Sequence, residues 1–151
     1  MTRGKMSVNV LFVCNQNSIR SPMAEILLRE IAKEHGATGA VLAESAGVYE
    51  GAFDPFLPTV LEEIDAKQPE TPPRDLSNVD LSGFDVLVAL TLEAETALKD
   101  AGPEDRVEFW ETENPSLTRG SREQILEGYR RVRTQLGEQI KKRFGDVFAK
   151  A

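Results

Sequence analysis

Short apolar runs and longer amphipathic segments alternate along this chain. Four apolar runs predict β-strands: residues 8–13, 40–45, 85–90 and 107–110. The first of these runs is almost wholly apolar, which is typical of a strand buried on both faces. Between the runs, apolar residues at helical spacing predict four helices: residues 22–35, 55–66, 92–101 and 121–144.

The alternation of strands and helices predicts a parallel sheet with helices on both faces. We therefore expect an α/β protein with a three-layer α/β/α fold of the flavodoxin-like type and four parallel strands. A chain of 151 residues has room for one domain, predicted to span 1–151. Ligands of such sheets bind beyond the carboxyl ends of the strands. Cys14 is expected there, because it directly follows the first predicted strand.

Local signals mark several element ends. Pro22 suits the first position of the first predicted helix, and Gly36 suits its exit. Asp54 is predicted to cap the second helix. The segment 68–74 contains three prolines and is predicted to be a loop.

The segment between the first strand and the first helix can carry chemistry. The Cys14 thiol and the Arg20 guanidinium can close around one tetrahedral oxyanion. If the intervening loop curls, its backbone N–H groups form an anion nest, and the following helix adds its positive end. This positive field favours the thiolate form of Cys14, which is the nucleophilic form. The alternative is that Cys14 is an inert cysteine buried in the core. The predicted phosphate-binding residues are Asn15, Gln16, Asn17, Ser18, Ile19 and Arg20.

Composition excludes several other classes of protein. The net charge of −7 argues against binding to nucleic acid or to an acidic membrane, and no apolar run is long enough to span a bilayer. A single cysteine excludes an intrachain disulfide and suits a reducing cytoplasm, and we read no signal peptide at the start of the chain. With one histidine and one cysteine, no metal cluster and no cofactor are predicted.

The residues from Cys14 to Glu25 resemble the phosphate loop of low-molecular-weight protein tyrosine phosphatases. They are equally similar to the loop of the thioredoxin- or mycothiol-linked arsenate reductases, which share that fold. The resemblance extends along nearly the whole chain, through 44–47, Asp54-Pro55, 110–115 and 120–144.

The resemblance implies a role for each residue of the loop. Cys14 would attack phosphorus in line and form a phosphocysteine, while Arg20 would hold two equatorial oxygens. Ser21 would donate its hydroxyl to the thiolate, or cap the helix, or do both. Asn17 would stabilise the tight loop in a left-handed conformation. Ser45 would belong to the same hydrogen-bond network, although a satisfied core serine is nearly as good a reading.

The segment that should carry the general acid departs from the family. The family uses the Asp of an Asp-Pro pair, and this chain has Asn114 before Pro115. An amide cannot protonate a leaving alkoxide, so acid catalysis is expected to be impaired. The alternative is that Glu113 or Glu111 swings in as the proton donor. The other Asp-Pro pair, at Asp54, is read as a helix cap.

Three further departures bear on the substrate. Gln16 stands where many relatives have a small residue. Ile19 stands where several have a second cysteine, so this chain lacks both a protective disulfide and an internal thiol relay. Where tyrosine-specific relatives have aromatic residues after the proline, this chain has Ser116 and Leu117. Tyr49 and Phe53 are expected to supply part of the missing wall.

These features predict a cysteine-dependent phosphomonoesterase of the protein tyrosine phosphatase type in its substrate class. It would act through a phosphocysteine intermediate at Cys14, and Asn114 would occupy the position of the general acid. One alternative is an arsenate reductase that uses an external low-molecular-weight thiol. A second is a degenerate phosphatase that only binds phosphate. The expected ligands are a phosphorylated protein or a small aryl phosphate, together with inorganic phosphate, sulfate or arsenate.

Overall fold

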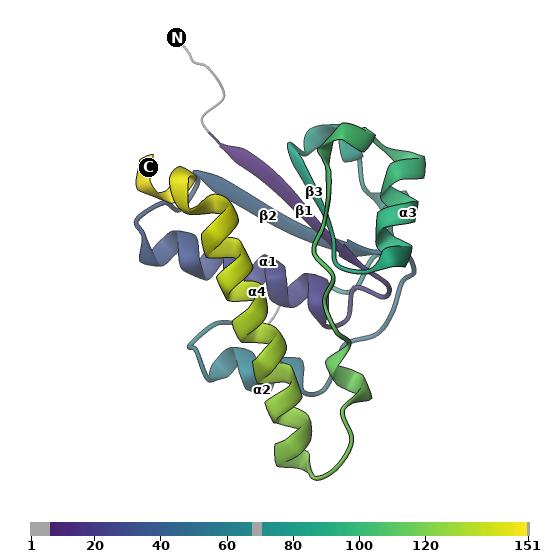
Figure 1. Ribbon diagram of the computed structural model, residues 1–151, viewed down its shortest axis with the longest axis vertical. Coiled ribbons are helices and arrows are strands. Elements are labelled where there is room, and N and C mark those ends of the chain that lie inside the picture. Colours follow the sequence, from purple (N-terminus) through teal and green to yellow (C-terminus); the bar gives the residue numbers. More distant parts are fainter. Residues whose placement is uncertain (1–6, 68–70, 151) are drawn as a thin grey trace.

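The computed structural model describes residues 7–67 and 71–150 (Figure 1). Four parallel strands form one sheet in the order β2–β1–β3–β4, which confirms the predicted α/β class. The strands are β1 (Val8–Cys14), β2 (Val41–Gly47), β3 (Val86–Ala89) and β4 (Val107–Phe109). The α-helices of the described residues are α1 (Arg20–Glu34), α2 (Leu57–Glu62), α3 (Leu92–Ala101) and α4 (Arg122–Lys150).

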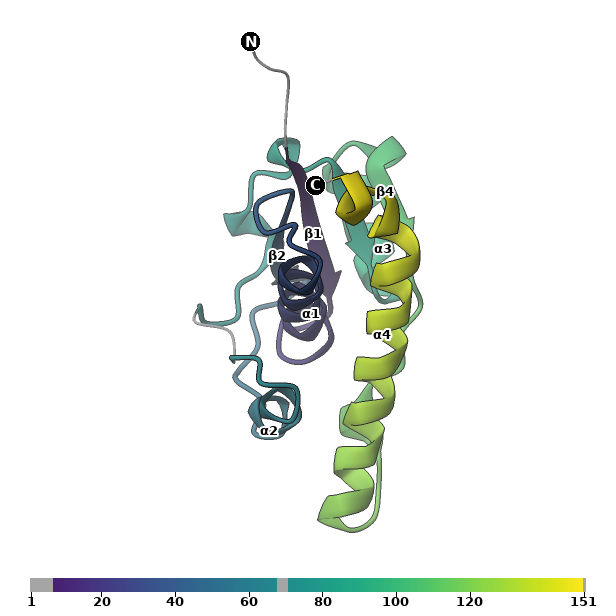
Figure 2. The ribbon, with the colours of Figure 1, turned by 90° about the vertical axis from the view of Figure 1, so that its left-hand side faces the viewer.

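Helices cover both faces of the sheet and give it three layers (Figures 1 and 2). Side chains of β1 alternate between the two cores, as the period of a strand requires. Val10 and Phe12 pack with residues of α1, α2 and α4, whereas Leu11 and Val13 pack with residues of α3. Because β1 is central and buried on both faces, its carboxyl end is a rigid base for the loop that follows. None of the described helices is long and apolar enough to cross a membrane.

Several predicted helix ends differ from the structure, and three of them differ for an identifiable local reason. Helix α1 begins at Arg20 rather than Pro22, because the N–H of Met23 already bonds to the Ile19 carbonyl at 2.9 Å. Helix α2 ends at Glu62 rather than residue 66, because Asp65 adopts a left-handed conformation with φ 57°. Helix α4 continues beyond residue 144 to Lys150, because the buried Phe148 extends its apolar stripe and stacks on His35. The first three residues of the predicted loop 68–74 lie outside the described residues.

Short 3₁₀ turns, which the sequence pattern did not predict, join several elements. They occupy Leu76–Asn78, Leu81–Gly83, Glu104–Arg106 and Pro115–Leu117. The last of these turns lies beside the predicted acid position. Its N-cap is Asn114, whose side-chain oxygen accepts a hydrogen bond from the backbone N–H of Ser116.

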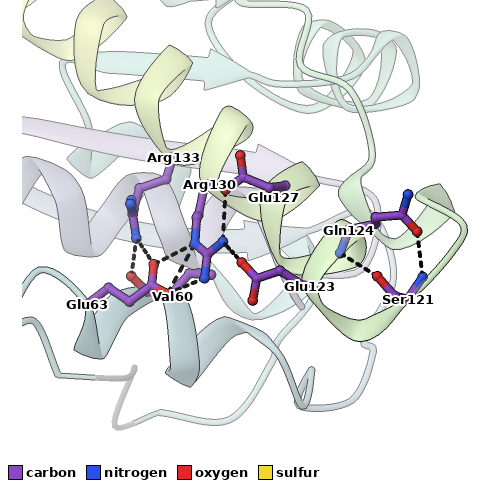
Figure 3. A network of polar contacts seen from close by, with 8 residues as sticks. All are labelled: Val60, Glu63, Ser121, Glu123, Gln124, Glu127, Arg130 and Arg133. Carbon is purple, nitrogen blue, oxygen red and sulfur yellow. Dashed lines mark hydrogen bonds and ion pairs between the residues drawn. The ribbon is translucent and has the colours of Figure 1, made fainter.

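Polar contacts fix α2 against α4 (Figure 3). The Glu63 carboxylate accepts hydrogen bonds from Arg130 and Arg133, and these bonds lower the pKa of Glu63 to about 2. The N-cap residue of α2 is Phe56 rather than the predicted Asp54, because the helix begins at Leu57. Asp54 still supports the helix start from just before it: its Oδ2 accepts the backbone N–H groups of Phe56 and Leu57 at 2.9 and 3.1 Å. Its other oxygen accepts the hydroxyl of Tyr129 from α4 at 2.9 Å.

Candidate active site

Cys14 ends β1, is 2% exposed, and opens the loop to α1. The segment after β2 fixes the first two peptide planes of that loop. The N–H of Val48 bonds to the Cys14 carbonyl at 3.0 Å, and the N–H of Tyr49 bonds to the Asn15 carbonyl at 2.8 Å. A trans peptide points its N–H opposite to its carbonyl. The N–H groups of Asn15 and Gln16 therefore face away from this segment, toward the inside of the loop.

Two glycines let the segment after β2 lie directly on the loop. A Cβ at Gly47 would stand 2.7 Å from the backbone nitrogen of Asn17. A Cβ at Gly51 would stand 2.6 Å from the carbonyl oxygen of Gln16. Neither position has room for a side chain, so the loop is held from behind by backbone contact.

Asn17 sets the direction of the hydrogen bonds that reach the thiol. Its left-handed backbone, with φ 54°, is the one expected from the sequence. The backbone N–H of Arg74 donates to Oδ1 at 3.0 Å, so Nδ2 must be the donor group. Nδ2 donates to the hydroxyl oxygens of Ser21 and Ser45 at 2.9 and 3.0 Å. Ser21 Oγ lies 3.0 Å from Cys14 Sγ and 3.2 Å from the carbonyl oxygen of Ala46, so its single proton has both the sulfur and that carbonyl as acceptors within reach.

The network continues from Ser45 to a buried carboxylate on α1. Ser45 donates its hydroxyl to Glu25 Oε1 at 2.6 Å, and Glu25 also pairs with Arg29 at 2.7 Å. Burial raises the pKa of Glu25, and the contacts with Ser45 and Arg29 oppose that shift. Sequence reasoning gave Glu25 no role. The available signal was a charged residue between the core residues Ala24 and Ile26.

Arg20 opens α1 on the other side of the loop and is half-buried. Its Nη1 donates to the backbone carbonyl of Thr112 at 3.0 Å, which fixes the guanidinium plane. Burial lowers the pKa of Arg20, and the charge of Cys14 opposes that shift. An arginine stays protonated in proteins, so its remaining N–H groups are available to an anion.

A second anchor of the loop comes from the start of α3. Thr91 donates its hydroxyl to Asn15 Oδ1 at 2.7 Å and accepts the backbone N–H of Ala94 at 3.0 Å. It thus caps α3 and fixes the Asn15 side chain at once. Sequence reasoning missed Thr91. The signal was a threonine directly after an apolar strand and before a helix.

A cleft of about 240 Å³ opens over the loop. Asn114 and Ser116 line this cleft together with Cys14. Asn114 Oδ1 accepts both the N–H and the hydroxyl of Ser116, at 3.0 and 2.7 Å, so the amide nitrogen is the group left for a ligand. Among the described residues, no carboxylate and no histidine lines this cleft. The lining residues are Cys14, Asn15, Gln16, Ser18, Ile19, Arg20, Asn114 and Ser116.

Several residues expected near the site lie elsewhere. Glu113 pairs with Arg131 of α4 at 2.8 Å and does not line the cleft. Glu111 is exposed and does not line it either. Tyr49 and Phe53 are 54% and 64% exposed and do not line this cleft, although Phe53 lines a neighbouring pocket with Asn17 and Ser18. The Tyr49 hydroxyl donates instead to Glu93 of α3.

The loop thus brings the Cys14 thiol and the fixed Arg20 guanidinium to one cleft. The family model "Low molecular weight phosphotyrosine protein phosphatase" matches residues 9–150. The chain belongs to this family, as the resemblance of its loop predicted.

Named relatives include phosphatases and arsenate reductases. YfkJ of Bacillus subtilis, a low molecular weight protein-tyrosine-phosphatase, is 33% identical over 95 residues, which cover 57% of this chain and 58% of that protein. This chain thus spans less than two thirds of that relative. The structure of a phosphatase from T. tengcongensis matches with a TM-score of 0.79 and 25% identity, covering 93% of this chain and 99% of that one. The structure of an arsenate reductase from Archaeoglobus fulgidus matches with a TM-score of 0.70 and 33% identity, covering 90% and 98%.

Proposed function

We propose that this protein is a cysteine-dependent phosphomonoesterase of the protein tyrosine phosphatase type. The observation that carries the proposal is the contact between Cys14 and Ser21 inside a loop closed by Arg20. The Cys14 thiolate attacks phosphorus, an S–P bond forms, and the P–O bond to the leaving group breaks. Arg20 and the loop N–H groups hold the equatorial oxygens, and they bind the charge of the transition state most strongly.

Water completes the cycle in a second step. Its oxygen attacks the phosphorus of the phosphocysteine, the S–P bond breaks, and the electron pair returns to Cys14. The Ser21 hydroxyl, which accepts a bond from Asn17 Nδ2, turns its proton from the Ala46 carbonyl to the departing thiolate and stabilises it. The protons of the attacking water remain on the phosphate product.

Proton transfer to the leaving group is the weak part of this cycle. The acid position holds Asn114, and the carboxylate next to it in the sequence, Glu113, pairs with Arg131. A placed general acid is worth about 10²–10⁴-fold. We therefore expect activated aryl phosphates such as para-nitrophenyl phosphate to turn over, and phenyl or alkyl phosphates barely to do so.

Arsenate reduction is the second candidate function. Arsenate has the shape and charge of phosphate, so the loop of Cys14 and Arg20 accommodates either. The relatives favour this candidate too, because a protein named glutaredoxin arsenate reductase, from Synechocystis, is 28% identical over 131 residues. Cys14 is the only cysteine of the chain, so an external thiol would have to complete the reduction. The single cysteine also suits a reducing compartment such as the cytoplasm.

One assay set separates the candidates. Turnover of para-nitrophenyl phosphate is measured for the wild type and Cys14→Ser, beside arsenate reduction with glutathione or mycothiol. Phosphate or sulfate should also protect Cys14 from alkylation, because it fills the loop in front of the thiol. Arsenate reduction without phosphate-ester turnover would replace the proposal by its alternative. Protection without any turnover would leave a phosphate-binding module, and an unchanged alkylation rate would exclude the loop as an oxyanion site.

A further inference from the structure

The amide of Asn114 has a fixed orientation in the wall of the cleft. A backbone N–H can donate to the amide oxygen of an asparagine but not to its NH₂ group, so the bond from the Ser116 N–H identifies Oδ1. The Ser116 hydroxyl takes the same oxygen at 2.7 Å. The donor group, Nδ2, has no hydrogen-bond partner among the described residues. Asn114 therefore offers a ligand two N–H bonds and no acceptor.

The position of this amide relates it to the leaving group. Asn114 and Ser116 line the same cleft as Cys14 and Arg20, the pair proposed to hold the phosphoryl group. In this proposal the Asn114 amide lies beside the leaving group. In-line attack by Cys14 expels the leaving group on the side of phosphorus away from the thiolate. An N–H donor there stabilises negative charge on the leaving oxygen, but it cannot transfer a proton to it.

Such a site suits a leaving group that is weakly basic from the start. The conjugate acid of a phenolate such as that of tyrosine has a pKa of about 10, whereas that of a carboxylate has a pKa of about 4. At neutral pH a carboxylate leaves as a stable anion, and a hydrogen bond is all the help it needs. An alkoxide or an unactivated phenolate needs the proton that Asn114 lacks.

We propose that the substrates matched to this cleft are acyl phosphates, in which a phosphoryl group is joined to a carboxylate oxygen. This inference rests on the cysteine phosphoryl transfer proposed above. Cys14 Sγ attacks phosphorus, the P–O bond breaks, and its electron pair stays on the carboxylate, which accepts a hydrogen bond from Asn114 Nδ2. Water then cleaves the S–P bond, so an acyl phosphate and water give a carboxylate and dihydrogen phosphate.

No other described group around the cleft supplies the missing proton. Glu113 Oε1 is taken by Arg131 Nε at 2.8 Å. The Ser116 hydroxyl donates to Asn114 itself, and the Ser21 hydroxyl serves the thiolate on the far side of phosphorus. The described surroundings of the cleft thus favour a substrate that brings a good leaving group.

The test compares leaving groups in one enzyme. The rate constant kcat/KM is measured for acetyl phosphate, para-nitrophenyl phosphate and phenyl phosphate, with Cys14→Ser as the blank for spontaneous hydrolysis. A protein domain phosphorylated on an aspartate forms a second arm, which distinguishes an acyl phosphate on a protein from a free one. We expect acetyl phosphate to exceed phenyl phosphate by at least about 10²-fold, the usual worth of the absent acid.

Variants of Asn114 test its role as a hydrogen-bond donor. Asn114→Ala should lower kcat/KM for acetyl phosphate about tenfold, the usual worth of one hydrogen bond to a charged group. The matched control is Asn78→Ala, which removes an exposed asparagine outside the cleft and should change nothing. Asn114→Asp should raise the rate for phenyl phosphate far more than the rate for acetyl phosphate.

The experiment distinguishes a failure of the proposed function from a failure of the inference about acyl phosphates. If para-nitrophenyl phosphate is not hydrolysed in a Cys14-dependent way, the proposed function itself is wrong. If it is hydrolysed, but phenyl phosphate is turned over as fast as acetyl phosphate, the inference about acyl phosphates is wrong. It is equally wrong if Asn114→Ala leaves the acetyl phosphate rate unchanged. Turnover of acetyl phosphate alone would assign free acyl phosphates, and turnover of the phosphorylated domain as well would assign a protein source.

Discussion

The two walls of the cleft differ in how many hydrogen bonds and backbone contacts hold them in place. On the phosphate-loop wall, Cys14, Asn17 and Ser21 form one connected set of hydrogen bonds, and Gly47 and Gly51 let backbone support it from behind. The other wall is formed by Asn114 and Ser116, and the amide oxygen of Asn114 is bonded only within its own turn.

This difference indicates that anion binding and proton transfer depend on separate segments of the fold. The loop wall needs only N–H groups, a guanidinium and a thiol, all supplied within one short segment. Proton transfer needs a carboxyl group on the other wall, and the adjacent Glu113 does not line the cleft but pairs with Arg131 on α4. The protein is therefore expected to bind and attack phosphate normally while selecting substrates by leaving group.

The largest effect is expected on the loop wall. Cys14→Ser removes the thiolate that attacks phosphorus, so hydrolysis of para-nitrophenyl phosphate should fall to the uncatalysed rate. Binding of inorganic phosphate, followed by calorimetry, should remain, because Arg20 and the loop N–H groups are intact. Residual catalysis in this variant would show that another group attacks phosphorus.

A substitution at Asn114, on the other wall, is expected to raise activity. Asn114→Asp should raise the hydrolysis of phenyl phosphate by about 10²-fold or more, because it restores a proton donor. Para-nitrophenyl phosphate should gain much less, since its leaving group hardly needs the proton. If the wild type hydrolyses both well and the variant changes neither, Glu113→Gln is the next measurement. A large loss in Glu113→Gln would then identify Glu113 as the acid.

Substitutions in the segment after β2, which packs behind the loop, should lower kcat/KM less than substitutions in the loop itself. Gly51→Ala places a Cβ 2.6 Å from the Gln16 carbonyl oxygen, so the loop must shift. A misplacement of that kind costs about tenfold to 10²-fold in kcat/KM. Gly83→Ala is the matched control, because its Cβ meets nothing within 4 Å. Equal rates in the two variants would mean that the segment after β2 does not position the loop.

The smallest effect concerns stability rather than catalysis. The arginines of α4 lower the pKa of Glu63 from 4.5 to about 2, so its ion pairs stabilise the fold above pH 4.5 and are lost as the pH falls toward 2. Glu63→Gln should cost on the order of 1 kcal/mol of unfolding free energy at neutral pH and low salt. The cost should vanish in acid, as urea titrations can measure. Glu62→Gln, an exposed neighbour, is the control, and a pH-independent cost would contradict the account.

The sequence predicted the order and type of the strands and α-helices because buried parallel strands appear as apolar runs, of which β1 is the clearest. It misjudged helix ends, where single residues decide. Asp65 stops α2 by a left-handed turn, and Phe148 extends α4 by stacking on His35. Neither event leaves a periodic signal.

The candidate site was predictable where it is local in sequence. Cys14 and Arg20 lie in one short loop, so their spacing could be read directly. The contacts of Arg74 with Asn17, of Thr91 with Asn15 and of Arg131 with Glu113 join segments far apart in the chain. Spacing carries no information about such contacts, so the anchors of the loop and the orientation of Glu113 required the structure.

The central claim is that Cys14 carries the phosphoryl group between two steps. The direct measurement is rapid denaturing quench during turnover of para-nitrophenyl phosphate, followed by digestion and mass spectrometry. The account predicts a phosphoryl group on the peptide that contains Cys14 in the wild type and none in Cys14→Ser. Steady turnover with Cys14 unmodified, or with the phosphoryl group on another residue, would contradict it.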